Sequence, residues 1–127
     1  MATQPASAAA RVIDAQLAAY NHRDLEAFVA CFAAGVELRN GGAPATEGLD
    51  GLRDLYAPQF ATQRVEAEVR ARLVLGEWVV DDERLTGPAP VALRALIAYR
   101  VRDGLIDRIE MLAAEPEQQP SAGKDGR

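Results

Sequence analysis

The acidic run Asp81-Asp82-Glu83 contains the one carboxylate that we expect to point toward the interior of the protein. Asp82 follows the two-residue alternation of a strand with Trp78 and Val80, so it points inward if those apolar residues do. Burial among apolar side chains raises the pKa of a carboxyl group toward neutrality and suits the group to general acid–base work. We therefore predict that Asp82 is a catalytic residue that carries a proton.

An exposed acidic edge is the alternative for the same run, because consecutive charges usually form a solvated surface. Asp82 would then either pair with an arginine, for which the candidates are Arg72, Arg84 and Arg94, or lie exposed beside its two acidic neighbours. The residues alone leave both interpretations open.

Other polar residues are expected around the same cavity. Asn40 alternates with Val36 and Leu38, so its amide is predicted to face the core as a second catalytic residue that orients substrate or water. The alternative is a strand-end residue that pairs with the glycine turn after it. The predicted ligand-binding residues lie on apolar stripes and form a pocket with a few placed polar groups: Gln16, Tyr20, Tyr56, Trp78, Ile97 and Tyr99.

Hydrophobic periodicity indicates the elements that would position these residues. Helical spacing of apolar residues predicts helices over 9–21, 24–34 and 49–57, and alternation predicts strands over 36–40, 65–73, 78–85, 91–102 and 105–112. Helices followed by hairpin-connected strands are typical of an α+β fold, with the helices packed on one face of an antiparallel sheet. We predict one domain over residues 9–114, with disordered tails over 1–8 and 115–127.

Composition excludes several classes of function. The chain has 127 residues, 49% of them hydrophobic, and a net charge of −5, which disfavours nucleic acid and anionic membranes as partners. A single cysteine and a single histidine exclude an internal disulfide and a multi-histidine metal site, so we predict no metal. The sequence shows neither an apolar run long enough to span a membrane nor a secretion signal, and a cytoplasmic location is expected.

The order of several segments resembles one known group of proteins. Residues 20–28, with Phe32 and 36–38 after them, are similar to the opening of the nuclear transport factor 2-like superfamily, which includes SnoaL-like polyketide cyclases and ketosteroid isomerase. Residues 48–56, 76–83 and 98–106 resemble its third helix and its last strands. The resemblance implies a cone-shaped, curved antiparallel or mixed sheet wrapped around three N-terminal helices, an internal cavity, a small apolar ligand, and a homodimer formed through the outer sheet face.

Ketosteroid isomerase offers the sharpest comparison within that superfamily. Its general-base aspartate falls at Asn40, its oxyanion-hole tyrosine at Gln16 and its oxyanion-hole aspartic acid at Ile97. An amide is no base at neutral pH, and an isoleucine donates no hydrogen bond. The resemblance therefore extends to the fold but not to the isomerase's catalytic residues.

Two hypotheses about function follow. The first is a small-molecule-binding domain that acts, without a cofactor, as an isomerase, cyclase, dehydratase or hydrolase on a hydrophobic metabolite. The second is a non-catalytic module whose cavity is filled by its own side chains and which dimerises or docks a partner. The missing isomerase residues favour the second hypothesis, and the inward polar positions favour the first.

Overall fold

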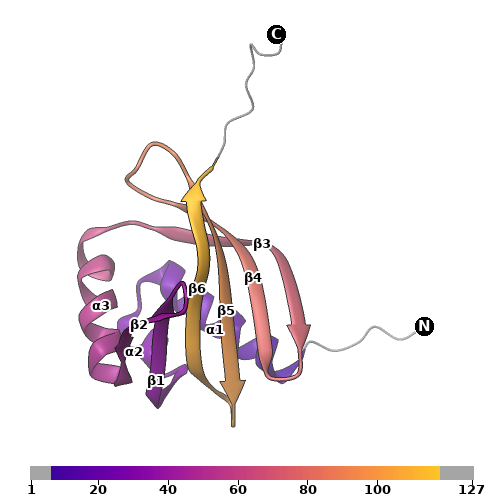
Figure 1. Cartoon of the computed structure of the whole chain (residues 1–127). Helices are drawn as coiled ribbons and strands as arrows, with labels where there is room; N and C mark the ends of the chain where they lie inside the picture. The colour runs from indigo at the N-terminus through magenta and orange to yellow at the C-terminus, as the bar shows by residue number, and fades with distance from the viewer. Residues whose placement is uncertain (1–6, 118–127) are drawn as a thin grey trace.

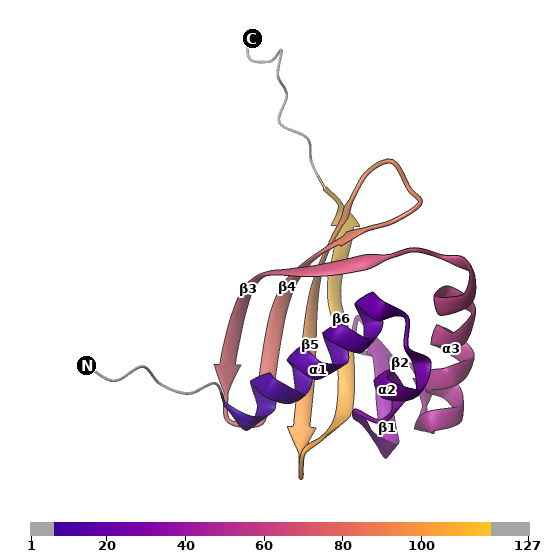
Figure 2. The same ribbon diagram turned by 180° about the vertical axis from the view of Figure 1, so that it is seen from behind.

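A curved six-stranded sheet with three helices forms the fold in a computed structural model that describes residues 7–117 (Figures 1 and 2). The elements in chain order are α1 (Ala8–His22), α2 (Leu25–Val29), β1 (Phe32–Asn40), β2 (Ala43–Glu47), α3 (Gly48–Thr62), β3 (Glu66–Leu75), β4 (Trp78–Thr86), β5 (Leu93–Arg102) and β6 (Leu105–Pro116). This arrangement confirms the predicted α+β class, and the sheet is open rather than closed into a barrel.

The strand order is β2-β1-β6-β5-β4-β3, in which only β1 and β6 run parallel to each other. Sequential hairpins connect β3 to β4 and β5 to β6, as the sequence predicts, and positive φ angles at Asp103 and Gly104 form the second turn. Helix α1 lies across one face of the sheet, as Figure 2 shows, and α3 stands beside it. The sheet and these two helices enclose the core.

Helix α1 is fixed by its caps and by its apolar stripe. The Ser7 hydroxyl accepts a hydrogen bond from the Ala10 amide at 2.9 Å, and Arg23 adopts the left-handed conformation that ends the helix. Ile13 and Leu17 lie one turn apart and are buried against the sheet. Gln16 lies on the same stripe and is therefore carried into the interior with them.

The second helix is shorter than its periodicity predicts. It ends at Val29, and β1 begins at Phe32, because Phe32 pairs with Ile106 of β6 in the parallel ladder. Residues with a helical pattern of apolar side chains therefore form a strand, because they pair with β6. Gly35 lies inside this strand rather than at the end of a helix. Strand β2 was not predicted, and α3 continues through Pro58 to Thr62.

The predicted tails overlap with described elements at their inner ends. Ser7 caps α1, Ala8 begins it, and β6 extends through Pro116. Residues 1–6 and 118–127 lie outside the described residues, so most of both predicted tails is not tested. Within residues 7–117, no helix is both long enough and apolar enough to cross a membrane.

Candidate active site

A cavity of about 140 Å³ lies between α1, α3 and the sheet. Its polar lining comes from Gln16, Tyr20, Tyr56, Gln59, Glu83 and Tyr99. Its apolar lining comes from Leu17, Ala67, Leu85, Ile97, Ile109 and Met111. Five of the predicted ligand-binding residues thus meet at one site: Gln16, Tyr20, Tyr56, Ile97 and Tyr99.

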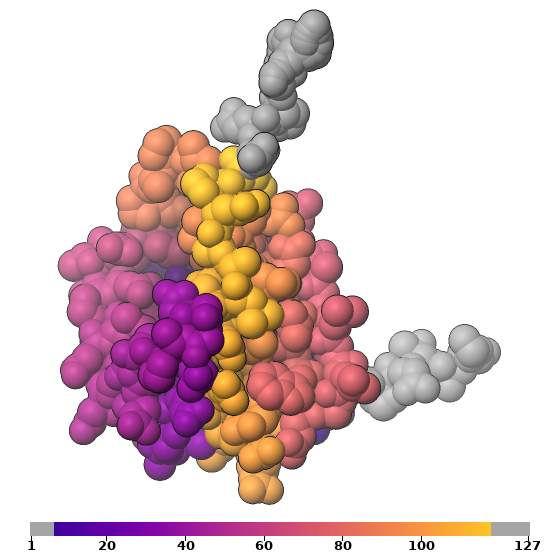
Figure 3. Space-filling model, viewed as in Figure 1, coloured from indigo at the N-terminus to yellow at the C-terminus, as the bar shows by residue number. Residues whose placement is uncertain are grey.

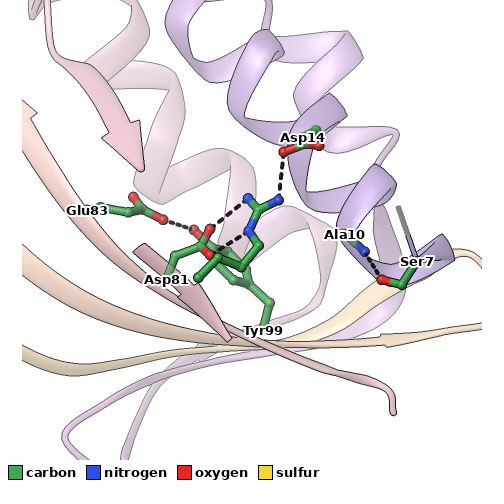
Figure 4. Close-up of polar contacts among 7 residues, drawn as sticks. Ser7, Ala10, Asp14, Asp81, Glu83 and Tyr99 are labelled. Atoms are coloured by element: carbon green, nitrogen blue, oxygen red, sulfur yellow. Dashed lines mark hydrogen bonds and ion pairs between the residues drawn. The ribbon is translucent and has the colours of Figure 1, made fainter. Parts of the chain in front are cut away.

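Glu83 is the carboxylate of this cavity. Strand β4 alternates cleanly between buried and less buried positions, which turns Val79, Asp81 and Glu83 toward the interior. Glu83 is only 2% exposed, and the Tyr99 hydroxyl donates a hydrogen bond to its Oε2 at 2.6 Å (Figure 4). Burial raises the pKa of Glu83 to about 7, although the Tyr99 hydrogen bond favours the charged form and opposes part of that rise.

A buried ion pair lies next to Glu83 on the same strand. Asp81 is fully buried, and the Arg72 guanidinium holds both of its carboxylate oxygens, at 2.7 and 3.0 Å. Arg72 also donates to Asp14 of α1 at 2.8 Å, as drawn in Figure 4, and so links the β3–β4 hairpin to the helix. The negative charge of Asp81 contributes to the raised pKa of Glu83, and the positive charge of Arg72 partly offsets that contribution.

The aromatic hydroxyls of the cavity remain protonated at neutral pH. Burial is the largest cause of the raised pKa of Tyr56, and it also raises the pKa of Tyr99 well above its ordinary value. Burial is also the largest cause of the raised pKa of Tyr20. The cavity therefore offers neutral hydroxyl donors and one carboxyl group that can change charge near neutral pH.

The expected inward orientation of Asp82 is wrong. Asp82 lies on the opposite sheet face, where Arg94 binds its carboxylate at 2.6 Å and each side chain is 35% exposed. This is the ion-pair alternative stated above. Trp78, whose alternation suggested the inward orientation, also lies outside, with the Arg100 guanidinium 5.7 Å from its ring centroid.

Asn40 does not line the cavity either. It is the last residue of β1, lies opposite Met111 in the sheet register and is exposed. The next residue, Gly41, donates its amide to the Met111 carbonyl at 2.8 Å, and the chain turns away there. Asn40 therefore shares the inner face of the sheet with Leu38 and Met111, as its alternation predicts, but it lies at the exposed end of the strand and outside the cavity lining.

Comparison with known proteins shows the family. Residues 13–109 match the SnoaL-like domain family, which is most of the chain. The chain belongs to the SnoaL-like domain family. A search of curated proteins gives no match.

Solved structures share the fold of this SnoaL-like domain at low sequence identity. RV0760c from Mycobacterium tuberculosis is 14% identical with a TM-score of 0.77, over 91% of this chain and 100% of its own. A putative polyketide cyclase from Sinorhizobium meliloti is 19% identical with a TM-score of 0.71, over 80% of this chain and 93% of its own. The Delta 5-3-ketosteroid isomerase from Mycobacterium sp. is 17% identical with a TM-score of 0.73, over 84% of this chain and 92% of its own.

Glu83 and Gln59 are the polar site residues that sequence reasoning missed, although a signal for Glu83 was present. Positive φ at Gly76 forms a tight β3–β4 hairpin in which Leu75 lies opposite Trp78. Counting back from that turn places Arg72 opposite Asp81, so two opposite charges share one sheet face. That face also contains Glu83, two residues further along the SnoaL-like domain's fourth strand.

The described part of the chain offers no evident metal centre. Within residues 7–117, no three or more histidine, cysteine, aspartate or glutamate side chains are grouped so that they could hold an ion.

Proposed function

We propose that this SnoaL-like domain binds a small, largely apolar molecule in the Glu83 cavity and catalyses a proton transfer on it without a cofactor. One observation carries the proposal: Glu83 is buried in a mostly apolar cavity, is held by the Tyr99 hydroxyl, and has a pKa of about 7. A general acid or base works best when its pKa lies near the working pH, and such perturbed groups gather at functional sites.

Glu83 would act first as a base. Its carboxylate takes a proton from a carbon next to a carbonyl group, and the resulting carboxylic acid returns the proton to another atom of the same molecule. Tyr99 fixes the carboxylate through its hydrogen bond, so one oxygen stays free to accept the proton. Isomerisation, cyclisation and dehydration all need such a step. The base proposed here lies at a different position from that of the isomerase, because the residue that resembles the isomerase base is the exposed Asn40.

The cavity volume bounds the ligand. About 140 Å³ is close to the roughly 150 Å³ of an engineered apolar cavity that binds benzene, so the enclosed part fits a single ring. RV0760c has been crystallised in complex with estradiol-17beta-hemisuccinate, which supports a ring-containing ligand for the fold. A whole steroid is larger than this cavity, so we expect the cavity to receive a single ring of the ligand.

Hydrogen–deuterium exchange of a cyclic ketone tests the proposal without knowledge of the natural substrate. Cyclohexanone is incubated with the protein in D₂O, and loss of its α-protons is followed by NMR. We expect the wild-type protein to accelerate exchange and Glu83→Gln to lose about 10²- to 10⁴-fold of that acceleration, the usual contribution of a general base. Asp82→Asn is the matched control, because it removes the neighbouring carboxylate from the outer face, and it should retain the wild-type rate.

Equal rates for wild-type protein, Glu83→Gln and buffer would contradict the catalytic proposal. The second hypothesis, a non-catalytic dimerisation or docking module, would then be favoured.

We also propose a homodimer formed through the outer sheet face. Apolar side chains exposed on that face support it, with Leu73, Leu75 and Trp78 exposed by 74%, 84% and 37%. Association would bury this area and remove a sizeable exposed apolar patch. Analytical ultracentrifugation should give a dimer mass for the wild-type chain and a monomer mass for Leu75→Asp; a monomeric wild-type protein would contradict the proposal.

A cytoplasmic location stays a prediction.

A further inference from the structure

A second pocket, an open surface groove, adjoins the Glu83 cavity. It has a volume of about 460 Å³, and Tyr20, Gln59 and Leu85 belong to the walls of both. Figure 3 shows the surface hollowed beside α3, below the loop that joins β4 to β5. The three shared side chains therefore form the boundary between an inner compartment and an outer one.

The outer compartment is largely apolar. Val65, Pro88, Val91 and Leu93 contribute to its wall, and the loop over residues 87–92 supplies one side of it. Val91 is 40% exposed, which leaves its side chain in contact with water in the absence of a ligand. An apolar chain in this groove would remove that surface from water, with a gain that grows with each buried methylene.

The inner compartment contains an unsatisfied acceptor. Gln16 is 4% exposed and lines the inner cavity, and its buried Oε1 has no hydrogen-bond partner among residues 7–117. Buried polar atoms are almost always paired, and an unpaired one destabilises the site. A hydroxyl or N–H group on a ligand would satisfy this oxygen, whereas a purely hydrocarbon ring would leave it unpaired.

We propose that the ligand has two parts: a single ring carrying a hydroxyl or N–H donor that binds Gln16 in the inner compartment, and an apolar chain that extends past Leu85 into the outer compartment. The inference rests on the proposed function for its site, and it adds a substrate class and two specificity-determining regions, Gln16 and the loop over residues 87–92. The wall that the two cavities share and the unpaired Gln16 oxygen carry it independently of the catalytic step.

Two matched series of ligands test both parts. The 4-alkylphenols carry a ring hydroxyl, and the 4-alkylfluorobenzenes have nearly the same shape without a donor. Dissociation constants are measured by isothermal titration calorimetry at pH 6 for chains from methyl to hexyl. We expect each added methylene that reaches the groove to tighten binding by about fourfold, as burial of roughly 0.8 kcal/mol per methylene implies. We expect the phenols to bind about tenfold more tightly than the matched fluorobenzenes, which corresponds to about 1.4 kcal/mol.

Two variants assign these gains to residues. Gln16→Met keeps the length of the side chain but removes the acceptor, so it should abolish the phenol advantage and leave the chain-length gain intact. Val91→Asp places a charge in the groove, so it should abolish the chain-length gain and leave the phenol advantage intact. Leu105→Asp is the control, because Leu105 is 37% exposed at the far end of the sheet, at the β5–β6 turn (Figure 1).

The outcomes separate this inference from the function on which it rests. Dissociation constants that do not change with chain length would overturn the inference while leaving a ring-binding site in place. So would tighter binding of the phenols that persists in Gln16→Met. A phenol advantage that disappears in Glu83→Gln but not in Gln16→Met would show that the phenol hydroxyl donates to Glu83 rather than to Gln16, and it would overturn the inference as well. If no member of either series binds the wild-type protein, the proposed small-molecule function fails together with the inference.

Discussion

Both faces of β4 carry acidic side chains, but those side chains differ in burial and in their partners. On the inner face, Glu83 is 2% exposed and has a pKa of about 7. On the outer face, one residue earlier, Asp82 is 35% exposed and is held by Arg94. Burial without a cationic partner makes a carboxyl group a candidate proton carrier, whereas a partner at the surface makes it half of an ordinary ion pair.

The ion pairs on the two faces differ in the same way. Arg72 and Asp81 are paired inside, with the Asp81 side chain fully buried, and Arg94 and Asp82 are paired outside. A buried charge that loses its partner keeps its desolvation penalty, but an exposed charge regains water. The comparison shows that a shift of one residue along a strand decides both the chemistry and the energetics of a charged group.

Removal of the inner cation should have the largest effect on stability. Arg72→Met leaves the Asp81 charge buried and unpaired, so we expect a loss of about 3–5 kcal/mol in the free energy of unfolding, measured by urea denaturation. The double variant Arg72→Met with Asp81→Leu should recover most of that loss, because no buried charge remains. A loss below 1 kcal/mol for the single variant would mean that water reaches Asp81.

The stability of the fold should also depend on the charge of Glu83. Its pKa is raised from 4.5 to about 7 in the folded state, so the folded protein binds more protons than the unfolded chain between those values. Stability is therefore full below pH 4.5 and falls as the pH rises to about 7, by up to roughly 3 kcal/mol. The difference in unfolding free energy between wild-type protein and Glu83→Gln, followed from pH 4 to 8, isolates this decline, and a flat difference would contradict it.

Loss of the Tyr99 hydroxyl should change the pKa of Glu83 in a defined direction. That hydroxyl donates to the carboxylate and favours the charged form, so Tyr99→Phe should raise the pKa of Glu83 further. The decline in stability would then continue to higher pH than in the wild-type protein. An unchanged or lowered midpoint would show that the hydrogen bond does not stabilise the charged form.

The outer pair should give the smallest effect. Arg94→Met removes an exposed partner, so we expect a change of about 0.2–1 kcal/mol in the free energy of unfolding, with a decrease in that effect at high salt. The matched comparison is with Arg72→Met, since both variants remove one arginine from one carboxylate. Equal losses in the free energy of unfolding for the two variants would show that the inner and outer ion pairs contribute equally to stability.

Most of the fold was predictable from alternation and turn residues. The hairpin-connected strands and α1 match their predicted ranges closely, because each has a continuous apolar pattern bounded by a turn or a cap. The second helix was predicted too long because Phe32 fits a helical stripe as well as a strand that pairs with Ile106. That pairing joins residues far apart in the sequence, so no local pattern reveals it.

The candidate site was predictable in part for the same reason. Gln16 and Tyr99 lie on long, regular elements, so their periodicity placed them in the cavity. The face of β4 could not be fixed by apolar content alone, since Trp78 and Val79 are adjacent and only one of them can point inward. The large ring of Trp78 suggested burial, but it stacks with Arg100 on the outer face. Pairing across the β3–β4 hairpin was the better guide.

The pKa of Glu83 itself tests the central claim most directly. Protein labelled with ¹³C at the glutamate side-chain carboxyl carbons is titrated from pH 3 to 9 by NMR, and the Glu83 signal is assigned by its absence in Glu83→Gln. We predict a midpoint near 7, well apart from the exposed glutamates. A midpoint near 4.5 would mean that Glu83 is hydrated and already charged at neutral pH, and it would contradict the assignment of Glu83 as the proton carrier.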